Sequence, residues 1–98
     1  MSIKLQILPS ATEDLEKGRD FYDRQGQGLG QYFLDSLCAD IDSLTLYGGI
    51  HSVHWGYHRM LSNRFPYAIY YRITGDIVVV WRVLDCRQHP IRTRRALP

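Results

Sequence analysis

Three residues in the second half of the chain have the side chains that cleavage of an RNA phosphodiester would need: Arg59, Arg82 and His89. Attack by a 2′-hydroxyl requires a base, an acid and a cation beside the phosphate. The arginines can supply the cation, and an unperturbed histidine, with a pKa of about 6.5, suits proton transfer. No tyrosine follows Tyr71, so His89 is the candidate for the proton transfer. His89 has no second acid–base group beside it in the sequence. The alternative interpretation is that His89 is a polar surface residue ahead of Pro90.

Arginines accumulate in the second half and define a candidate binding surface. Residues 1–50 carry a net charge of −4 and residues 51–98 one of +6, and every base in the second half is an arginine. Arginine is better suited than lysine to bidentate contact with phosphate or carboxylate. The second half therefore predicts an anionic partner, which can be RNA, DNA or an acidic protein segment. The alternative to a binding surface is that these arginines lie on a solvated face of the sheet. The arginines that we expect to bind a target or partner are Arg59, Arg64, Arg82, Arg87 and Arg92.

A group of histidines and a cysteine has some features of a zinc site. The residues are His51, His54, His58, Cys86 and His89. The spacing of the first three would suit a helix, but that stretch is not helical in character. Zinc sites usually need three or four ligands that converge on the ion. We expect incidental loop histidines, with no metal and no cofactor.

Two other motifs resemble features of nucleotide-binding proteins. Residues 25–30 (Gln-Gly-Gln-Gly-Leu-Gly) resemble a phosphate-binding loop, but they follow a helical pattern and lack the lysine of a Walker loop. We expect a turn between two helices there. Tyr67, Tyr70 and Tyr71 could stack nucleic-acid bases. They fall on both faces of a strand, so at least one must belong to the core.

Length and composition indicate a single domain over residues 1–98, of a size that is common for one domain. The hydrophobic content of 45% suffices for one compact core. No segment approaches the roughly 18 apolar residues of a membrane span, and the start of the chain does not resemble a signal peptide. These features predict a cytoplasmic protein, in which Cys38 and Cys86 are free thiols.

The elements that must position these residues centre on one β-hairpin. Residues 67–73 are rich in aromatic and β-branched side chains, and residues 77–84 are almost wholly apolar. Thr74, Gly75 and Asp76 between them predict a tight turn with a left-handed residue. We expect this hairpin at the sheet centre. One of its faces should bury Ile69, Tyr71, Val79 and Trp81, or their register partners, against helices.

The rest of the chain supplies a strand, two helices and further strands. Residues 3–8 alternate as a half-buried strand does, and Pro9 ends it. The segment Ser10–Glu13 has capping-box spacing, which predicts a helix from there to about residue 24. A second helix is predicted over residues 29–47 and should form an antiparallel hairpin with the first. Residues 50–57 indicate an edge strand or loop, residues 58–64 a strand, and residues 91–97 a short turn. The prediction is an α+β fold: an N-terminal strand, an α-helical hairpin and an antiparallel three-stranded meander.

With this order the sequence resembles the RelE/ParE superfamily of bacterial toxins, and the ParE (plasmid stabilisation) branch more closely. The family's helix pattern is similar to Gly28-Leu29-Gly30 with Phe33, Leu37, Ile41 and Leu44. Its strand pattern is similar to Arg59 followed by Phe65-Pro66-Tyr67, Ile69 and Tyr71. Its ending is similar to residues 83–90, where this chain departs at Asp85, Gln88 and His89. The resemblance covers almost the whole chain.

This resemblance implies the toxin of a type II toxin–antitoxin system, neutralised by a cognate antitoxin whose acidic segment covers the arginines. ParE-type relatives inhibit DNA gyrase without being enzymes, and this is the mode we expect. RelE-type relatives cleave mRNA on the ribosome, and in that alternative Arg59, Arg82 and His89 would be catalytic. A second alternative is an inactive interaction module.

Overall fold

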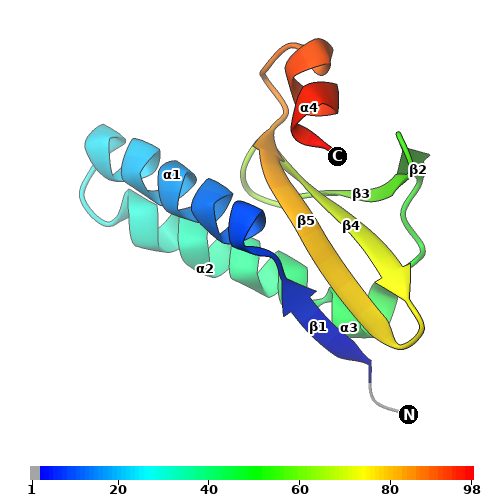
Figure 1. The fold of residues 1–98 in the computed structure, drawn as a ribbon. Coiled ribbons are helices and arrows are strands. Elements are labelled where there is room, and N and C mark those ends of the chain that lie inside the picture. The colour runs from blue at the N-terminus through cyan, green and yellow to red at the C-terminus, as the bar shows by residue number, and fades with distance from the viewer. Residues whose placement is uncertain (1–2) are drawn as a thin grey trace.

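The computed structural model of the chain describes residues 3–98, which form one mixed five-stranded sheet with helices on both faces (Figure 1). The helices are Pro9–Gln25 (α1), Leu29–Asp42 (α2), Leu44–Tyr47 (α3) and Pro90–Ala96 (α4). The strands are Lys4–Ile7 (β1), Val53–His54 (β2), Tyr57–Leu61 (β3), Tyr67–Thr74 (β4) and Ile77–Asp85 (β5). The predicted α+β fold is confirmed. No helix within residues 3–98 is both long and apolar enough to cross a membrane.

The β4–β5 hairpin lies at the centre of the sheet, as predicted. The strand order is β1-β5-β4-β3-β2, with β1 parallel to β5 and the other pairs antiparallel. Gly75 has a φ of 59°, the left-handed conformation that the tight turn requires. The ladder shifts register between Tyr70 and Tyr71, because Tyr70 pairs with Arg82 but Tyr71 pairs with Val80. This bulge leaves Trp81 without a direct partner on β4.

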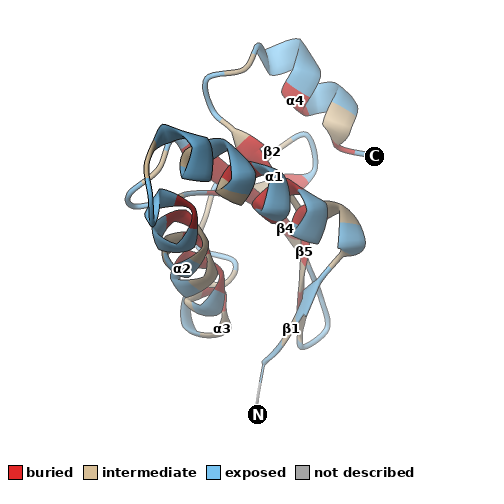
Figure 2. Cartoon of the chain, turned by 90° about the vertical axis from the view of Figure 1, so that its left-hand side faces the viewer, coloured by how far each residue is buried: buried red, intermediate tan, exposed pale blue. Residues whose placement is uncertain are grey.

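The antiparallel helices α1 and α2 cover one face of the sheet, which we call the inner face (Figure 2). Gly18 of α1 allows close packing, because a Cβ there would lie 2.4 Å from the Phe33 ring. The buried core on this side is contributed by α1, α2 and α3 and by β3, β4 and β5. Its members are Ala11, Leu15, Phe33, Leu37, Ile41, Leu44, Met60, Tyr67, Ile69, Tyr71, Val78, Val80 and Val83.

A second, smaller cluster occupies the opposite face, which we call the outer face. It contains Tyr57, Ala68, Tyr70, Leu84 and Leu97, with Trp81 and Ala96 packed against it. Burial of Ile69 and Tyr71 against the helices is confirmed, whereas the choice of Val79 and Trp81 for that face was wrong. Their neighbours Val78 and Val80 lie there instead, and Val80 is the register partner of Tyr71. Because helices cover both faces of β5, apolar residues occur on both and the pattern does not identify the inner one.

Two predicted details of the helices were also wrong. Ser10 is not a helix cap: α1 begins at Pro9 after Leu8, and the Ser10 hydroxyl donates to the Trp81 carbonyl at 2.8 Å. Proline suits this first helical position, where its missing N–H is not needed. The second helix is interrupted at Ser43, whose hydroxyl donates to the Asp40 carbonyl, so that α3 forms a separate turn. The strand expected over residues 58–64 is β3, and it ends at Leu61.

Candidate functional site

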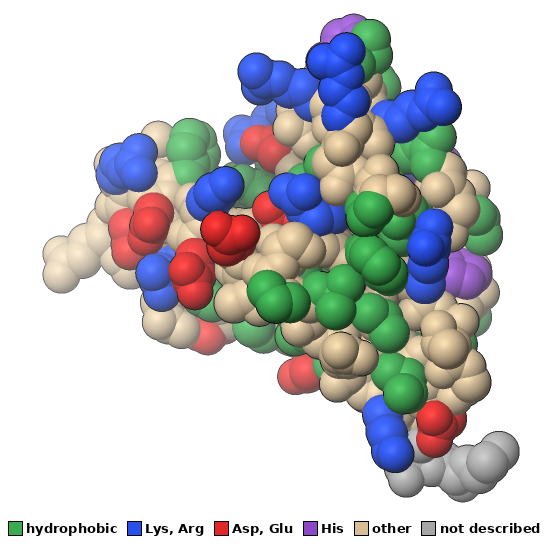
Figure 3. All heavy atoms as spheres, in the orientation of Figure 1, with side chains coloured by type: hydrophobic (Ala, Val, Ile, Leu, Met, Phe, Trp, Pro, Cys, Tyr) green, Lys and Arg blue, Asp and Glu red, His purple; other side chains and the backbone are tan. Residues whose placement is uncertain are grey.

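The predicted site residues do not form one cluster. Arg59 of β3 is paired with Tyr70 of β4, and Tyr70 is paired with Arg82 of β5, so these three residues form a row across the sheet. Arg87 and His89 lie between β5 and α4. In the space-filling view, arginine side chains crowd the end of the molecule around α4 (Figure 3). This end therefore presents an electropositive surface.

The Arg82 guanidinium is engaged by an internal carboxylate. Its Nε and Nη2 donate to the two oxygens of Asp14 at 2.7 and 2.8 Å, and its Nη1 donates to the Ala96 carbonyl at 3.1 Å. Asp14 is only 8% exposed and also accepts the Val83 backbone N–H at 3.0 Å. The hydrogen bonds to Asp14 raise the pKa of Arg82. Arg82 thus ties α1 to β5 and α4, and its guanidinium has little capacity left for another anion.

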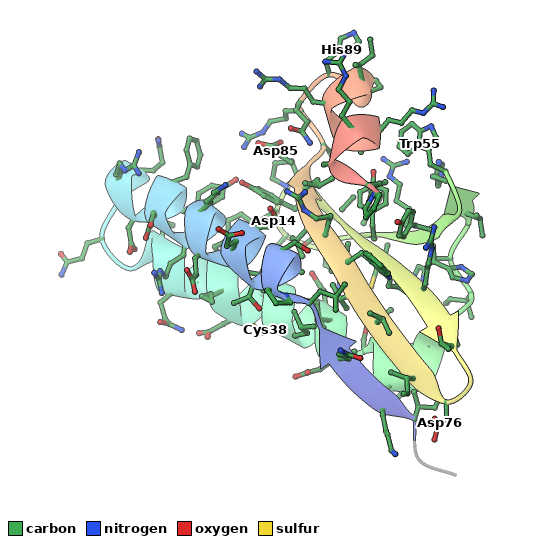
Figure 4. The ribbon with its side chains drawn as sticks, in the orientation of Figure 1. Asp14, Cys38, Trp55, Asp76, Asp85 and His89 are labelled. Carbon is green, nitrogen blue, oxygen red and sulfur yellow. The ribbon has the colours of Figure 1, made fainter. Side chains whose placement is uncertain are left out.

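Asp14 and Ser10 of α1 complete the edge of β5. The strand β1 pairs with β5 only from Ile77 to Val80, so among residues 3–98 no strand pairs with the end of β5 beyond Val80 on that side. There Ser10 donates to the Trp81 carbonyl and Asp14 accepts from the Val83 N–H. Side chains one helical turn apart therefore replace the missing strand. Figure 4 shows Asp14 between α1 and β5.

Arg87 is paired within its own loop. Its Nε and Nη2 donate to the two oxygens of Asp85 at 2.9 and 2.8 Å, and its backbone N–H donates to the same carboxylate. Its guanidinium also lies 5.8 Å from the centre of the Phe21 ring. The hydrogen bonds from Arg87 hold the pKa of Asp85 below its ordinary value. The pair is partly exposed, so Arg87 remains within reach of a partner at the surface.

Arg64 and Arg92 are exposed to solvent, but they lie in different places. The Arg64 guanidinium donates to the Tyr32 hydroxyl of α2 at 2.8 Å, which raises the pKa of Arg64. Arg92 lies on α4 with Arg94 and Arg95, all three exposed. A single small ligand does not bridge these positions. If all the predicted arginines bind one partner, that partner must be large.

His89 caps the last helix. Its ring Nδ1 accepts the Ile91 backbone N–H at 3.1 Å, and Pro90 takes the first helical position. The side chain is exposed, and Figure 4 shows it at the tip of the molecule. The lone pair of Nδ1 is engaged in this cap, so a neutral His89 carries its proton on Nε2. His89 lies outside the two clefts that contain Arg59 and Arg82.

Arg59 lines a cleft of about 160 Å³ on the outer face. The walls come from the β2–β3 turn with His54 and Trp55, from Tyr70, and from the segment between β5 and α4. Its Nε is buried without a hydrogen-bond partner among residues 3–98. Burial raises the pKa of the neighbouring Tyr70 hydroxyl, and the positive charge of Arg59 opposes that rise. Arg59 is thus the predicted arginine with an unused donor inside a cleft.

A second cleft, of about 280 Å³, lies between α1 and the end of β5. It is lined by Asp14 and Arg82 and by Lys17, Phe21 and Tyr67. Burial, and next the Asp85 carboxylate, raise the pKa of Tyr67 to about 12. The charged groups at its base neutralise one another through the Asp14–Arg82 pair. Lys17 adds a cation to this cleft, whereas the buried donor without a partner among residues 3–98, Arg59 Nε, lies in the other cleft.

Comparison with known families identifies the chain. A family profile described as the ParE toxin of the type II toxin–antitoxin system, parDE, matches residues 5–90. The chain belongs to the ParE toxin family. This confirms the resemblance to the ParE branch, and membership implies a cognate antitoxin as partner. Comparison with curated proteins found no match.

A solved structure shares the fold of this ParE toxin. It is described as the chromosomal ParDE TA system from P. aeruginosa, with a TM-score of 0.75 at 18% sequence identity. The similarity covers 84% of this chain and 94% of the other. At this identity it shows the fold, including the strand–helix–helix–strand order that the sequence predicted.

The residues that resemble the ParE pattern mostly build the core. Phe33, Leu37, Ile41 and Leu44 are buried on the inner face. Gly28 has a φ of 82°, which lets the chain turn from α1 to α2, and the Gly30 N–H donates to Asp23 at 3.0 Å. The predicted helix–helix turn at residues 25–30 is thereby confirmed. The pattern identifies the fold rather than a reactive centre.

Two histidines and the tyrosines of β4 in this ParE toxin serve the packing. His51 and His58 both contact the Tyr71 ring, and the Tyr71 hydroxyl accepts the Gly49 N–H at 2.9 Å. Among residues 3–98, no three His, Cys, Asp or Glu side chains converge as a metal site would require. Base stacking by the tyrosines is excluded as they stand, because Tyr67, Tyr70 and Tyr71 are all buried, with exposures of 8%, 4% and 0%.

Sequence reasoning missed two residues that shape the site. Asp14 binds Arg82. The sequence feature that pointed to Asp14 is its position four residues after Ser10, which places both side chains on one face of a helix. Trp55 lines the Arg59 cleft. Its backbone φ is 53°, which is unusual for a bulky residue. Its signal was the following Gly56, since a residue before glycine between two short strands often forms a left-handed turn.

Proposed function

We propose that this chain is the toxin of a toxin–antitoxin pair, and that it arrests growth by inhibiting DNA gyrase until its antitoxin neutralises it. The observation that carries the proposal is the ParE family match over residues 5–90, because gyrase inhibition is the typical mode of that family. Inhibition by binding needs a complementary surface but no assembled acid–base centre. The exposed arginines around α4 provide a surface of that kind.

The placement of the candidate catalytic residues supports a non-enzymatic mode over mRNA cleavage. A nuclease needs an acid–base group beside the cation that stabilises the phosphate. His89 caps α4 outside the clefts, and Arg82 is engaged by Asp14. Tyr70 lies beside Arg59, but burial raises its pKa, so it is a poor base at neutral pH. None of the predicted catalytic residues therefore places a base beside Arg59. The histidine that lines the Arg59 cleft is His54, whose Nε2 is hydrogen-bonded to Ser52, and a RelE-type nuclease would have to use it.

The first experiment asks whether the chain is toxic. Inducible expression of the intact chain in bacteria should stop growth, and co-expression with the protein encoded beside it should restore growth. Normal growth at a high level of soluble protein would refute the toxin proposal and favour an inactive interaction module.

The second experiment identifies the target. Purified chain mixed with gyrase, ATP and relaxed plasmid should reduce supercoiling and increase gyrase-dependent cleaved DNA. Translating ribosomes with a defined mRNA provide the matched assay for the nuclease alternative. Intact gyrase activity together with cut mRNA would replace gyrase by the ribosome as the target.

A further inference from the structure

The Arg59 cleft contains a buried donor that the folded chain leaves unused. The Arg59 Nε–H has no acceptor among residues 3–98, although its nitrogen is shielded from solvent. An unpaired buried donor destabilises a fold, and such groups are uncommon in native proteins. Binding sites frequently retain groups of this kind, which lower the stability of the folded chain. An acceptor supplied by another molecule would remove this penalty.

The same cleft has a strained residue at its rim. Trp55 and Gly56 form the turn between β2 and β3 with φ angles of 53° and 84°. Glycine accepts this conformation freely, but a bulky side chain is rarely found in it. Trp55 is 46% exposed and lines the cleft with Arg59. Strained backbone of this kind concentrates at binding sites. The strain and the unpaired donor are separate observations at one place.

The size and charge of the cleft favour a single carboxylate. Its volume of about 160 Å³ is smaller than the roughly 300–1,000 Å³ of pockets that enclose small organic ligands. A cleft of this size suits one side chain better than a whole nucleotide. Among the lining residues, Arg59 provides the guanidinium, and Asp85 adds a carboxylate that is already bound by Arg87. A run of phosphates would need several free cations, which this cleft does not offer.

We propose that this cleft binds a carboxylate side chain of an acidic peptide segment. Arg59 pairs with the carboxylate, and the Trp55 indole packs on the next residue of the peptide. This inference rests on the proposed neutralisation by an antitoxin, whose acidic segment would be the ligand. The three exposed arginines of α4, Arg92, Arg94 and Arg95, extend the positive surface from the cleft and attract such a segment.

The test uses the intact chain and three probes of equal length. The first is an acetylated five-residue peptide of alternating glutamate and leucine, the second has glutamine for each glutamate, and the third is pentathymidylate. Calorimetry measures affinity, and NMR follows the Arg59 Nε–H and the Trp55 indole N–H. We expect the glutamate peptide to bind and to shift both signals. Equal binding of the glutamine peptide, or tighter binding of pentathymidylate, would overturn the proposal.

Variants assign the site within the same assay. Arg59→Lys keeps the charge but loses the planar fork, so affinity should fall about tenfold, and Arg59→Gln should weaken it further. Arg24→Lys is the matched control, because Arg24 is an exposed residue in the last turn of α1 that does not line the cleft, and this variant should bind as the unchanged chain does. Equal affinity of the two lysine variants would refute a role for Arg59. The NMR shifts of the unchanged chain test the site independently of any folding defect.

The strained turn gives a further variant. Asparagine accepts the left-handed conformation, so Trp55→Asn should raise the midpoint of thermal unfolding while weakening peptide binding. Lower stability with unchanged binding would contradict the role of Trp55. These assays contain no gyrase, so their outcome is separate from that of the gyrase experiment. A chain that binds the peptide but leaves gyrase active would keep this inference and refute gyrase as the target.

Discussion

Arg82 and Asp14 form a bidentate ion pair although 68 positions separate them along the chain. The pair links the edge of β5 to α1, and Arg82 also donates to the Ala96 carbonyl of α4. A residue that the sequence suggested for binding or catalysis is therefore part of the framework. Arg59, two strands away in the same cross-sheet row, has the unused donor instead.

Asp14→Asn tests the structural role of this pair. The amide keeps the shape but loses the charge that Arg82 requires, so the free energy of unfolding should fall by about 2–3 kcal/mol. Urea denaturation measures the loss. Glu13→Gln is the matched control, since Glu13 is an exposed neighbour on the same helix, and its effect should stay within about 0.5 kcal/mol. An equal effect of the two substitutions would show that the Asp14–Arg82 pair adds no stability.

The Asp85–Arg87 pair predicts a stability difference that depends on pH. Arg87 lowers the pKa of Asp85 below 3.8, its ordinary value. The unfolded chain then takes up a proton at a higher pH than the folded chain, so the stabilisation is complete above pH 3.8 and disappears as pH falls through the folded pKa. The difference in unfolding free energy between the unchanged chain and Asp85→Asn should narrow over that range. A constant difference down to pH 2, about the lower limit of carboxylate pKa values in such pairs, would contradict this assignment.

Tyr67 predicts a loss of stability at high pH. Its pKa is raised from 10.0 to about 12, so the folded chain resists losing this proton. Stability is unaffected below pH 10 and should decrease as pH rises toward 12. Ultraviolet absorbance of the phenolate measures the titration, and subtracting the curve of Tyr67→Phe isolates this residue. A difference curve centred at pH 10 would refute the shift.

Gly18→Ala probes the contact between α1 and α2. The new Cβ would lie 2.4 Å from Phe33, a ring with 0% exposure that has no room to move. Overpacking costs about 1–3 kcal/mol, against a gain of up to about 1 kcal/mol from helix propensity. We expect lower stability in thermal unfolding. Glu16→Ala on the exposed side of α1 is the control, and greater stability of Gly18→Ala would show that the helices can move apart.

The sequence was sufficient for the elements but not for the long-range contacts. The apolar run of β5 and the aromatic run of β4 have local patterns, and both strands were predicted within one or two residues. The face of Val79 and Trp81 was misassigned because both faces of β5 are covered and a bulge shifts the register at Tyr70. Nothing near Arg82 in the sequence points to Asp14, since that contact exists only after α1 packs along β5.

His89 separates the two proposed modes of toxicity. Its ring accepts the Ile91 N–H as the cap of α4, a role that asparagine also fills but alanine does not. Asparagine has no acid–base function at neutral pH, so His89→Asn keeps the cap and removes any proton transfer. A toxin that acts by binding gyrase should retain growth arrest in His89→Asn.

His89→Ala completes this comparison because it removes both the cap and the imidazole. It should lose about 1 kcal/mol of helix stability, seen as faster amide exchange in α4, and weaken growth arrest only if the order of α4 matters for the target. A nuclease that used His89 would lose activity in both variants alike. Loss of growth arrest in His89→Asn, with α4 still ordered, would therefore support the nuclease alternative over gyrase binding.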